Sequence, residues 1–105
     1  MVHPFIKDRL PELTELFRKY HVKKAYVFGS VVTDRFNDSS DVDFLIEPQG
    51  EADEPDPAMR GEVLWDLYYA LQDLLQRKVD MVTRDSLRNK YFIEELNEKS
   101  VPIYG

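Results

Sequence analysis

The sequence predicts a small α/β domain in which a mixed β-sheet carries helices against one face. Apolar residues recur at helical spacing near the start of the chain, and two short runs of aromatic and β-branched residues follow. A second helical pattern then leads to another short apolar run. The 105 residues are 43% hydrophobic, which is enough for one core, so we expect a single domain over residues 1–105.

The first predicted element is a helix from Pro4 to Tyr20. Its apolar residues are three or four positions apart, which places them on one face of the helix, and the other face is charged. The apolar positions are Ile6, Leu10, Leu13, Phe17 and Tyr20.

Two predicted strands follow, with a loop between them. Residues 25–28 (Ala-Tyr-Val-Phe) have the composition of a buried strand, which stops in a tight turn at Gly29 and Ser30. Residues 31–40 are rich in Asp, Asn, Ser and Thr, as loops are. Residues 41–46 then predict a second strand.

The second half of the chain predicts two helices and two strands. Apolar spacing indicates a largely buried helix over 63–75, and residues 79–82 predict a third short strand. Helical spacing returns over 87–98. Residues 101–104 include a proline, which strands tolerate at a sheet edge, so we expect an edge strand there.

An acidic segment separates the two halves. Residues 47–57 contain five acids, three prolines and no base, which predicts a solvated, flexible loop over 47–58.

The composition of the whole chain narrows its class. It has 14 Lys and Arg against 20 Asp and Glu, a net charge of −6, which disfavours a basic protein that binds nucleic acid directly. It has no cysteine, and no run approaches the ~20 apolar residues of a membrane helix. We therefore expect a soluble, cytoplasmic protein without disulfides or thiolate metal sites.

Residues suited to catalysis gather around the first loop. Gly29 and Ser30 follow the first strand, ten loop residues come next, and Asp41-x-Asp43 opens the second strand. Residues i and i+2 of a strand point to the same side, so Asp41 and Asp43 share one space. Two close carboxylates repel each other unless a divalent cation lies between them, and Mg²⁺ prefers such oxygen ligands. We therefore expect a Mg²⁺ site at this pair.

The turn and a third carboxylate complete the expected site. A glycine lets the backbone approach a ligand closely, so the N–H groups of the Gly29-Ser30 turn and the serine hydroxyl can hold triphosphate oxygens. Asp80 lies on an otherwise apolar strand, where an acid is costly unless it faces a metal, a base or solvent. We expect Asp80 to join the site, either as a metal ligand or as the base that accepts a proton from the attacking hydroxyl.

These motifs resemble those of a known family. Residues 27–30 (Val-Phe-Gly-Ser) and, after ten residues, 41–46 (Asp-Val-Asp-Phe-Leu-Ile) are similar to the minimal nucleotidyltransferases (MNT) of the DNA polymerase β superfamily. The similarity is specifically to the antitoxin member of HEPN/MNT toxin–antitoxin pairs. It implies a polymerase β-like fold and an enzyme that moves AMP from ATP to a tyrosine of a partner HEPN ribonuclease toxin, in a hetero-oligomer and with Mg²⁺.

The resemblance also implies roles for individual residues. It places the family's metal-binding aspartates at Asp41 and Asp43, its third catalytic carboxylate at Asp80, and its phosphate-binding pair at Gly29 and Ser30. Family members often continue the Gly-Ser pair with Ala-Arg-Gly, whereas the matching stretch here is Val32-Thr33-Asp34. The arginine is displaced by two positions, to Arg35, which either reaches the triphosphate from there or leaves the activity weakened.

Two other functions are compatible with the same residues. The displaced Arg35 favours an antitoxin that blocks its toxin by occlusion, without nucleotide chemistry. Alternatively, the chain is the catalytic half of a two-component transferase that acts on a small hydroxyl compound or on nucleic acid. With 105 residues there is little room for an acceptor pocket, and the net charge of −6 disfavours a nucleic-acid acceptor.

The remaining candidate residues have simpler interpretations. Trp65, Tyr68 and Tyr69 crowd one predicted helix, which is typical of a core and also allows a partner-binding surface. His3 and His21 have no partner at the spacing of metal ligands, so we expect neither to bind a metal.

Overall fold

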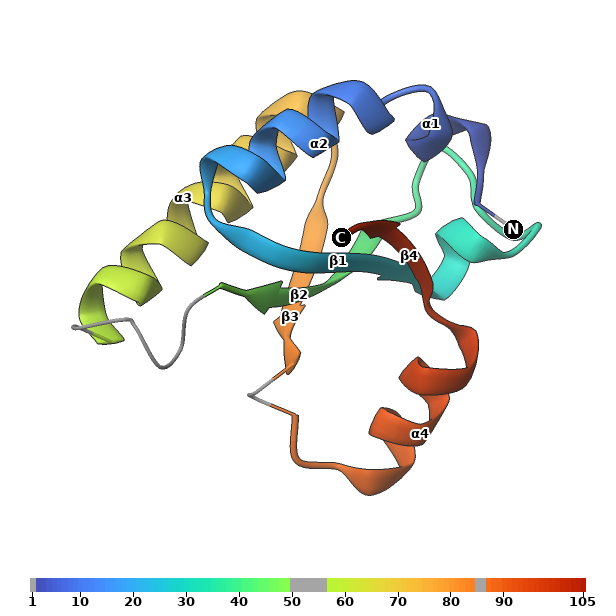
Figure 1. Ribbon diagram of the computed structural model, residues 1–105. Helices are drawn as coiled ribbons and strands as arrows, with labels where there is room; N and C mark the ends of the chain where they lie inside the picture. Colours follow the sequence, from blue (N-terminus) through green and yellow to red (C-terminus); the bar gives the residue numbers. More distant parts are fainter. Residues whose placement is uncertain (1, 50–56, 85–86) are drawn as a thin grey trace.

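A computed structural model of the chain describes residues 2–49, 57–84 and 87–105 (Figure 1). Its elements, in chain order, are α1 (Pro4–Lys7), α2 (Leu10–Lys19), β1 (Val22–Phe28), the 3-10 helix η1 (Gly29–Val32), β2 (Val42–Pro48), α3 (Pro57–Leu75), β3 (Val79–Thr83), α4 (Lys90–Lys99) and β4 (Val101–Tyr104). The strands form one sheet in the order β3-β2-β1-β4. β1 is antiparallel to both of its neighbours, whereas β2 and β3 are parallel. The predicted mixed α/β class is thus confirmed, as is the edge position of β4.

The first predicted helix is broken in two. α1 ends at Lys7 and α2 begins at Leu10, with Pro11 in the first turn of α2. A proline has no N–H to donate, and its ring clashes with the carbonyl four residues before it, which here belongs to Lys7. A regular helix across this position is therefore strongly disfavoured, although three of the predicted inward residues are still buried, namely Ile6, Leu13 and Phe17.

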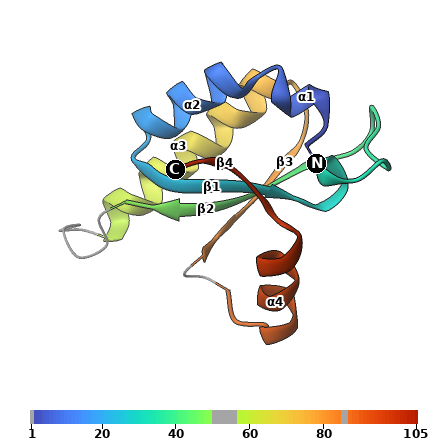
Figure 2. The same ribbon diagram turned by 45° about the vertical axis from the view of Figure 1, so that its right-hand side comes forward.

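The main core lies between the sheet and two of the helices. α2 and α3 lie together over one face of the sheet (Figure 1, Figure 2). Alternate strand residues face them and are fully buried, as strand geometry requires. These residues are Ala25 and Val27 of β1, Val42, Phe44 and Ile46 of β2, and Val79 of β3.

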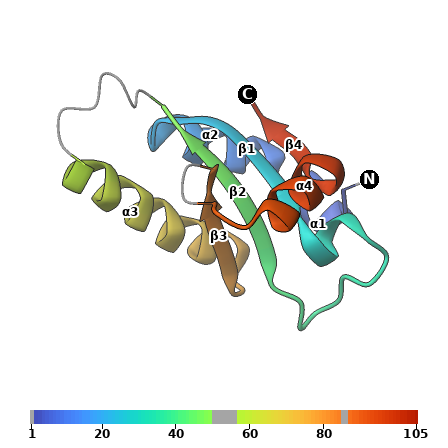
Figure 3. The ribbon, with the colours of Figure 1, turned by 90° about the horizontal axis from the view of Figure 1, so that it is seen from below.

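The third long helix lies on the opposite side of the sheet. We expected all the helices on one face, but α4 covers the other one (Figure 3). The cause is the second set of alternate strand residues, because Phe28 of β1 points away from the main core and meets Phe92 of α4, with ring centroids 6.0 Å apart. Leu45 and Leu96 are buried without belonging to the main core cluster.

The acidic segment is partly structured. Glu47 and Pro48 belong to β2, and Pro57 begins α3, so both ends of the expected 47–58 loop lie in regular elements. Glu47 accepts a hydrogen bond from the Tyr26 hydroxyl at 3.1 Å and pairs with Arg84 at 3.6 Å. These partners on β1 and beyond β3 hold the carboxylate in the sheet. The centre of the segment, residues 50–56, lies outside the described residues.

Turn chemistry sets the other boundaries. The side chain of Asn89 caps α4 by accepting a hydrogen bond from the N–H of Phe92, so this helix begins at Lys90 instead of at residue 87. His21, two residues after the end of α2, adopts a left-handed φ of 57°, which lets β1 begin at Val22, three residues before the predicted start. No helix within the described ranges is long and apolar enough to cross a membrane.

Candidate active site

Strand register brings the predicted carboxylates to one edge of the molecule. Phe28 of β1 is paired with Asp43 of β2, and Asp43 is paired with Asp80 of β3. Because paired residues on neighbouring strands point to the same face, the Asp43 and Asp80 side chains lie on the side that faces α4, away from the main core. The predicted convergence of Asp43 and Asp80 is therefore present, and two separate strands supply it.

Asp43 lies directly against the glycine of the predicted turn. Gly29 has a φ of +75°, a left-handed conformation that side chains disfavour. A Cβ at this position would lie 2.2 Å from Oδ2 of Asp43, far inside contact distance. Only a glycine therefore allows the turn and the carboxylate to occupy their positions together, which explains why the Gly-Ser pair and Asp43 belong to one site.

The carboxylates interact electrostatically. Burial, together with repulsion from the like charges of Asp80 and Asp41, raises the pKa of Asp43 to about 6. When Asp43 is protonated it donates a hydrogen bond to the carboxylate of Asp80, which adds to the same shift in pKa. Three acids thus share a small region, which is the charge arrangement that a divalent cation stabilises.

Asp41 was expected to open the second strand with Asp43, but it lies one residue before β2 and has a different immediate partner. Its Oδ2 lies 3.7 Å from Nζ of Lys78, at the start of the chain segment that leads into β3. In the part of the chain that the structure describes, no three Asp, Glu or His side chains are arranged to hold one metal ion. The donor chemistry of the three aspartates nevertheless fits Mg²⁺, since all of them offer carboxylate oxygens and Asp43 and Asp80 are within hydrogen-bonding reach of each other.

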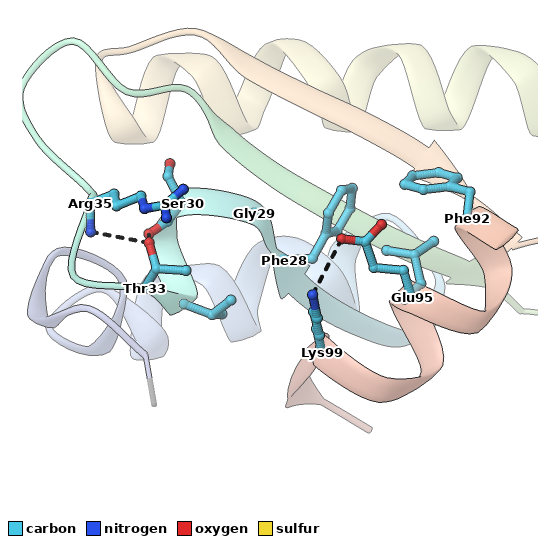
Figure 4. A pocket seen from close by; sticks show the side chains of 10 residues that line it. Phe28, Gly29, Ser30, Thr33, Arg35, Phe92, Glu95 and Lys99 are labelled. Atoms are coloured by element: carbon cyan, nitrogen blue, oxygen red, sulfur yellow. Dashed lines mark hydrogen bonds and ion pairs between the residues drawn. The ribbon is translucent and has the colours of Figure 1, made fainter.

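The Gly-Ser turn forms one wall of a pocket. η1 winds the backbone from Gly29 to Val32, and both the N–H and the hydroxyl of Thr33 donate to the carbonyl of Ser30, at 2.9 and 2.8 Å. Beside this turn is a pocket of about 400 Å³ (Figure 4). Its lining residues are Phe28, Gly29, Ser30, Val32, Thr33, Arg35, Phe92, Glu95, Leu96 and Lys99.

Arg35 lines this pocket despite its displaced position in the sequence. Its backbone N–H donates to the hydroxyl of Thr33 at 3.1 Å, which ties it to the turn that holds Ser30 (Figure 4). The guanidinium-bearing residue is therefore on the same wall as Gly29 and Ser30. The shift of two positions in the sequence does not remove it from the site.

α4 supplies pocket residues that the sequence analysis missed. Phe92, Leu96 and Lys99 are spaced by four and three positions, so one face of the helix lines the pocket. Nζ of Lys99 lies 3.7 Å from Oε1 of Glu95, so the helix also contributes an ion pair to the pocket lining (Figure 4). The helical spacing was visible in the sequence, but nothing in it indicated that this face would meet Phe28.

Sequence comparison gives the family. Residues 8–103 match the family described as "Nucleotidyltransferase domain". Two proteins of Methanocaldococcus jannaschii are also similar. "Putative protein adenylyltransferase MJ0126" is 35% identical over 85% of this chain and 84% of its own length, and "Putative protein adenylyltransferase MJ1217" is 32% identical over 90% and 97%.

Solved structures share the fold. A "putative minimal nucleotidyltransferase" superposes with a TM-score of 0.73 over 97% of this chain and 96% of its own, at 24% identity. A toxin–antitoxin complex with AMP-PNP gives 0.68 over 91% and 73%, at 22% identity. A complex of a tri-AMPylated Shewanella oneidensis HEPN toxin with an MNT antitoxin gives 0.64 over 94% and 71%, at 20% identity. The matched family and the shared fold are consistent with the strand carboxylates beside the Gly-Ser turn. The chain belongs to the nucleotidyltransferase domain family.

Proposed function

We propose that the chain is a Mg²⁺-dependent protein adenylyltransferase, an antitoxin that moves AMP from ATP to a tyrosine of a HEPN ribonuclease toxin and so neutralises it in the cytoplasm. The observation that carries the proposal is the meeting of Asp43 and Asp80 beside the turn of Gly29 and Ser30. Acids alone would repel a triphosphate. A triphosphate that binds together with a metal ion can lie beside these acids, because the cation neutralises the charge on both, and the pocket beside the turn leaves room for it.

Similar proteins support the nature of the reaction and of the partner. Four similar proteins of M. jannaschii carry the name of protein adenylyltransferase. Among the similar folds, one is a toxin–antitoxin complex that holds AMP-PNP, and another contains an AMPylated HEPN toxin. A hetero-oligomer with such a toxin is the assembly that we propose for this chain.

Each site residue has a role in this reaction. The backbone N–H groups and hydroxyl of the Gly29-Ser30 turn hold phosphate oxygens, and Arg35 adds positive charge on the same wall of the pocket. Asp41, Asp43 and Asp80 would hold Mg²⁺, with Asp41 leaving Lys78 to do so. The bound ion would neutralise phosphate charge and orient the triphosphate.

The transfer itself exchanges one bond to phosphorus for another. The tyrosine oxygen bonds to the α-phosphorus of ATP, the bond from that phosphorus to the bridging oxygen breaks, and pyrophosphate leaves. The tyrosine loses its proton in this step. Asp80 is the candidate acceptor when it is not a metal ligand, since it is exposed at the open edge of β3, where an acceptor protein can approach.

The test follows the AMP group. The purified chain is incubated with Mg²⁺, ATP labelled at the α-phosphate and a HEPN partner, and label on the partner is measured. We expect Asp41→Asn/Asp43→Asn to slow labelling at least about 100-fold, because transition-state charge is then no longer neutralised. The matched control is Asp34→Asn/Asp38→Asn, which makes the same charge change on the exposed loop before β2 and should label at the normal rate. Equal labelling by both double variants would contradict the proposal.

One observation favours a second function, a non-catalytic antitoxin that blocks the toxin by occlusion. Asp41 is paired with Lys78, and the described residues contain no ready three-ligand metal set. For an occluding antitoxin, Asp41→Asn/Asp43→Asn would still protect cells from the toxin at normal potency. Loss of protection together with loss of labelling would identify the enzyme instead.

A further inference from the structure

The outward face of α3 carries large aromatic side chains. Trp65 is 60% exposed and Tyr69 is 53% exposed. At 100° per residue the two lie on the helix face opposite to Leu67 and Leu71, which are fully buried in the main core. Such positions normally hold polar residues, so this face does not follow the usual amphipathic pattern of a helix on a sheet.

The exposed rings form one connected group, called here the α3 aromatic patch, made of Trp65, Tyr68 and Tyr69. The ring centroids of Trp65 and Tyr69 are 5.3 Å apart, and those of Trp65 and Tyr68 are 5.6 Å apart and stacked. Tyr68 packs against the main core on its other side. The patch is therefore held in place before any partner arrives, which lowers the entropy lost on binding.

The charged side chains of α3 that the structure describes are all acidic. Between Glu62 and Leu75, α3 contains three acids and no Lys or Arg, and the acids Glu62, Asp66 and Asp73 are exposed. All three lie within about 60° of Tyr69 around the helix. The outward face of α3 thus combines aromatic rings with carboxylates.

A groove continues this face toward α2. It has a volume of about 410 Å³ and lies between the two helices. Its rim bears further acids, and its only described basic lining residue is Lys19, whose ammonium nitrogen is 5.3 Å from the ring centroid of Tyr20. The acidic lining residues are Glu12, Glu15 and Asp73, of which Glu15 also pairs with Arg18, and the apolar lining residues include Leu16, Tyr20 and Leu74.

We propose that the α3 aromatic patch and the adjoining groove dock an arginine-bearing segment of a partner protein. A guanidinium group stacks on Trp and Tyr rings and pairs with carboxylates at the same time, which a lysine ammonium does less well. A second copy of this chain would bring acids against acids, and nucleic acid would meet the same repulsion. Charge complementarity therefore selects a cationic protein segment.

This surface is distinct from the proposed catalytic site. α3 lies on one face of the sheet, whereas Asp43, Asp80 and the Gly29-Ser30 pocket face α4 on the other (Figure 1, Figure 3). Binding at α3 leaves the pocket open, so the inference does not depend on nucleotide transfer. A binding measurement can test it even if the chain transfers no AMP.

Trp65 is the one tryptophan of the chain, and its fluorescence reports directly on the patch. The probe is the capped peptide (Arg-Ala)₄, with (Lys-Ala)₄ for comparison, at low salt. We expect saturable change in Trp65 fluorescence with the arginine peptide, and binding about threefold weaker with the lysine peptide. No fluorescence change would overturn the proposal. A change in Trp65 fluorescence that depends on protein concentration in the absence of peptide would indicate self-association and would also overturn it. So would a single-stranded RNA oligonucleotide that binds more tightly than the arginine peptide.

Matched variants separate the patch from the overall negative charge. Glu62→Gln/Asp66→Asn removes two acids four residues apart on α3, and Glu94→Gln/Glu98→Gln does the same on the exposed side of α4. The first pair should weaken binding of the arginine peptide about tenfold, and the second less than twofold. Tyr69→Ala should weaken it more than Tyr91→Ala, although Tyr91 is 80% exposed. Equal effects within either matched set would overturn the proposal.

Discussion

Among single residues, Asp43 is the one whose ionised form the site destabilises. Its side chain is half-buried, touches Gly29 and shares its surroundings with Asp80 and Asp41. Its pKa of about 6 in the folded protein exceeds its ordinary value of 3.8, so the folded state binds the proton more tightly than the unfolded state. The contribution of Asp43 to stability therefore falls as the pH rises from about 4 to about 6, and the penalty is fully present at neutral pH.

Asp43→Asn should remove this penalty. The shift of about two units corresponds to about 3 kcal/mol, and solvent screening at a half-exposed group reduces this to about 1 kcal/mol. In EDTA at pH 7.5 we expect the variant to melt about 4–8 °C above the parent, with no difference at pH 4. Thermal unfolding followed by circular dichroism at the two pH values measures this. An equal shift at both pH values, or the same shift in Asp38→Asn, would mean that the effect has another cause.

Gly29 depends on the same carboxylate. Gly29→Ala adds a methyl group 2.2 Å from Oδ2 of Asp43 and places a side chain at a φ of +75°. We expect a loss of about 2–3 kcal/mol in the free energy of unfolding, from the clash and the backbone strain together. Urea unfolding of Gly29→Ala measures the loss.

A double-mutant cycle divides that loss into its two parts. In an Asp43→Ala background the clashing oxygen is absent, and the nearest remaining atom, Cβ of residue 43, lies at an ordinary 3.7 Å. Gly29→Ala should then cost only the strain of about 1 kcal/mol. The same cost in both backgrounds would show that Asp43 does not constrain the turn.

Some residues of the candidate site could be predicted from the sequence, and some of their contacts could not. Gly29 and Ser30 stand out because a strand stops at them, and Asp41 and Asp43 because strand alternation puts i and i+2 on one side. The pairing of Asp41 with Lys78 was not accessible, since it joins residues 37 positions apart and depends on where β3 begins. The roles of Asp41, Asp43 and Asp80 in catalysis remain predictions.

At the level of elements, Arg77 links three segments around the predicted site. Its guanidinium carbon lies 4.2 Å from the ring centroid of Phe5 and 4.7 Å from that of Phe36. The same group donates hydrogen bonds to the carbonyls of Asn37 and Ser40, at 3.0 and 2.8 Å. Arg77 thus connects α1 to the loop that runs from the Gly-Ser turn to Asp41, and we assign it a positioning role.

Arg77→Ala should loosen that loop. Two cation–π contacts and two hydrogen bonds suggest a loss of about 2–3 kcal/mol in the free energy of unfolding. Arg77→Lys keeps the charge but neither the planar stacking nor the paired donors, so we expect an intermediate loss. Hydrogen exchange of the amides in 33–41 should accelerate in both variants while exchange in β1 stays slow. Acceleration throughout the sheet would indicate global destabilisation and no specific clamp.

Local patterns predicted most elements, and long-range contacts decided the exceptions. The predicted strands at 25–28 and 79–82 lie within β1 and β3, and the one at 41–46 coincides with β2 except for Asp41, which precedes it. Short β-branched and aromatic runs between polar segments have few other ways to be buried. The side of the sheet that α4 covers was not predictable, because it depends on Phe28 meeting Phe92. Glu47 was assigned to a loop from composition alone, whereas its partners are Tyr26 and Arg84.

For the molecule as a whole, the sheet separates two surfaces of different character. On the α4 side lie the carboxylates, the Gly-Ser turn and the pocket, and on the other side lie the main core and the outward face of α3. The layer between them is filled by fully buried side chains such as Phe44, Ile46 and Leu71. Close-packed layers of this kind transmit a signal only when an element in them has two alternative arrangements.

This arrangement predicts that the two surfaces act independently. ATP affinity, measured by titration calorimetry with Mg²⁺, should change less than about twofold when the (Arg-Ala)₄ peptide saturates the α3 patch, because coupling requires that one ligand favour a different conformation. By reciprocity, saturating ATP should leave the peptide affinity equally unchanged. Asp43→Asn should reduce ATP binding without affecting the peptide, and Glu62→Gln/Asp66→Asn should do the reverse. A change of tenfold or more in either cross-measurement would show that the sheet does connect the two faces, and that β2 or α3 has a second conformation.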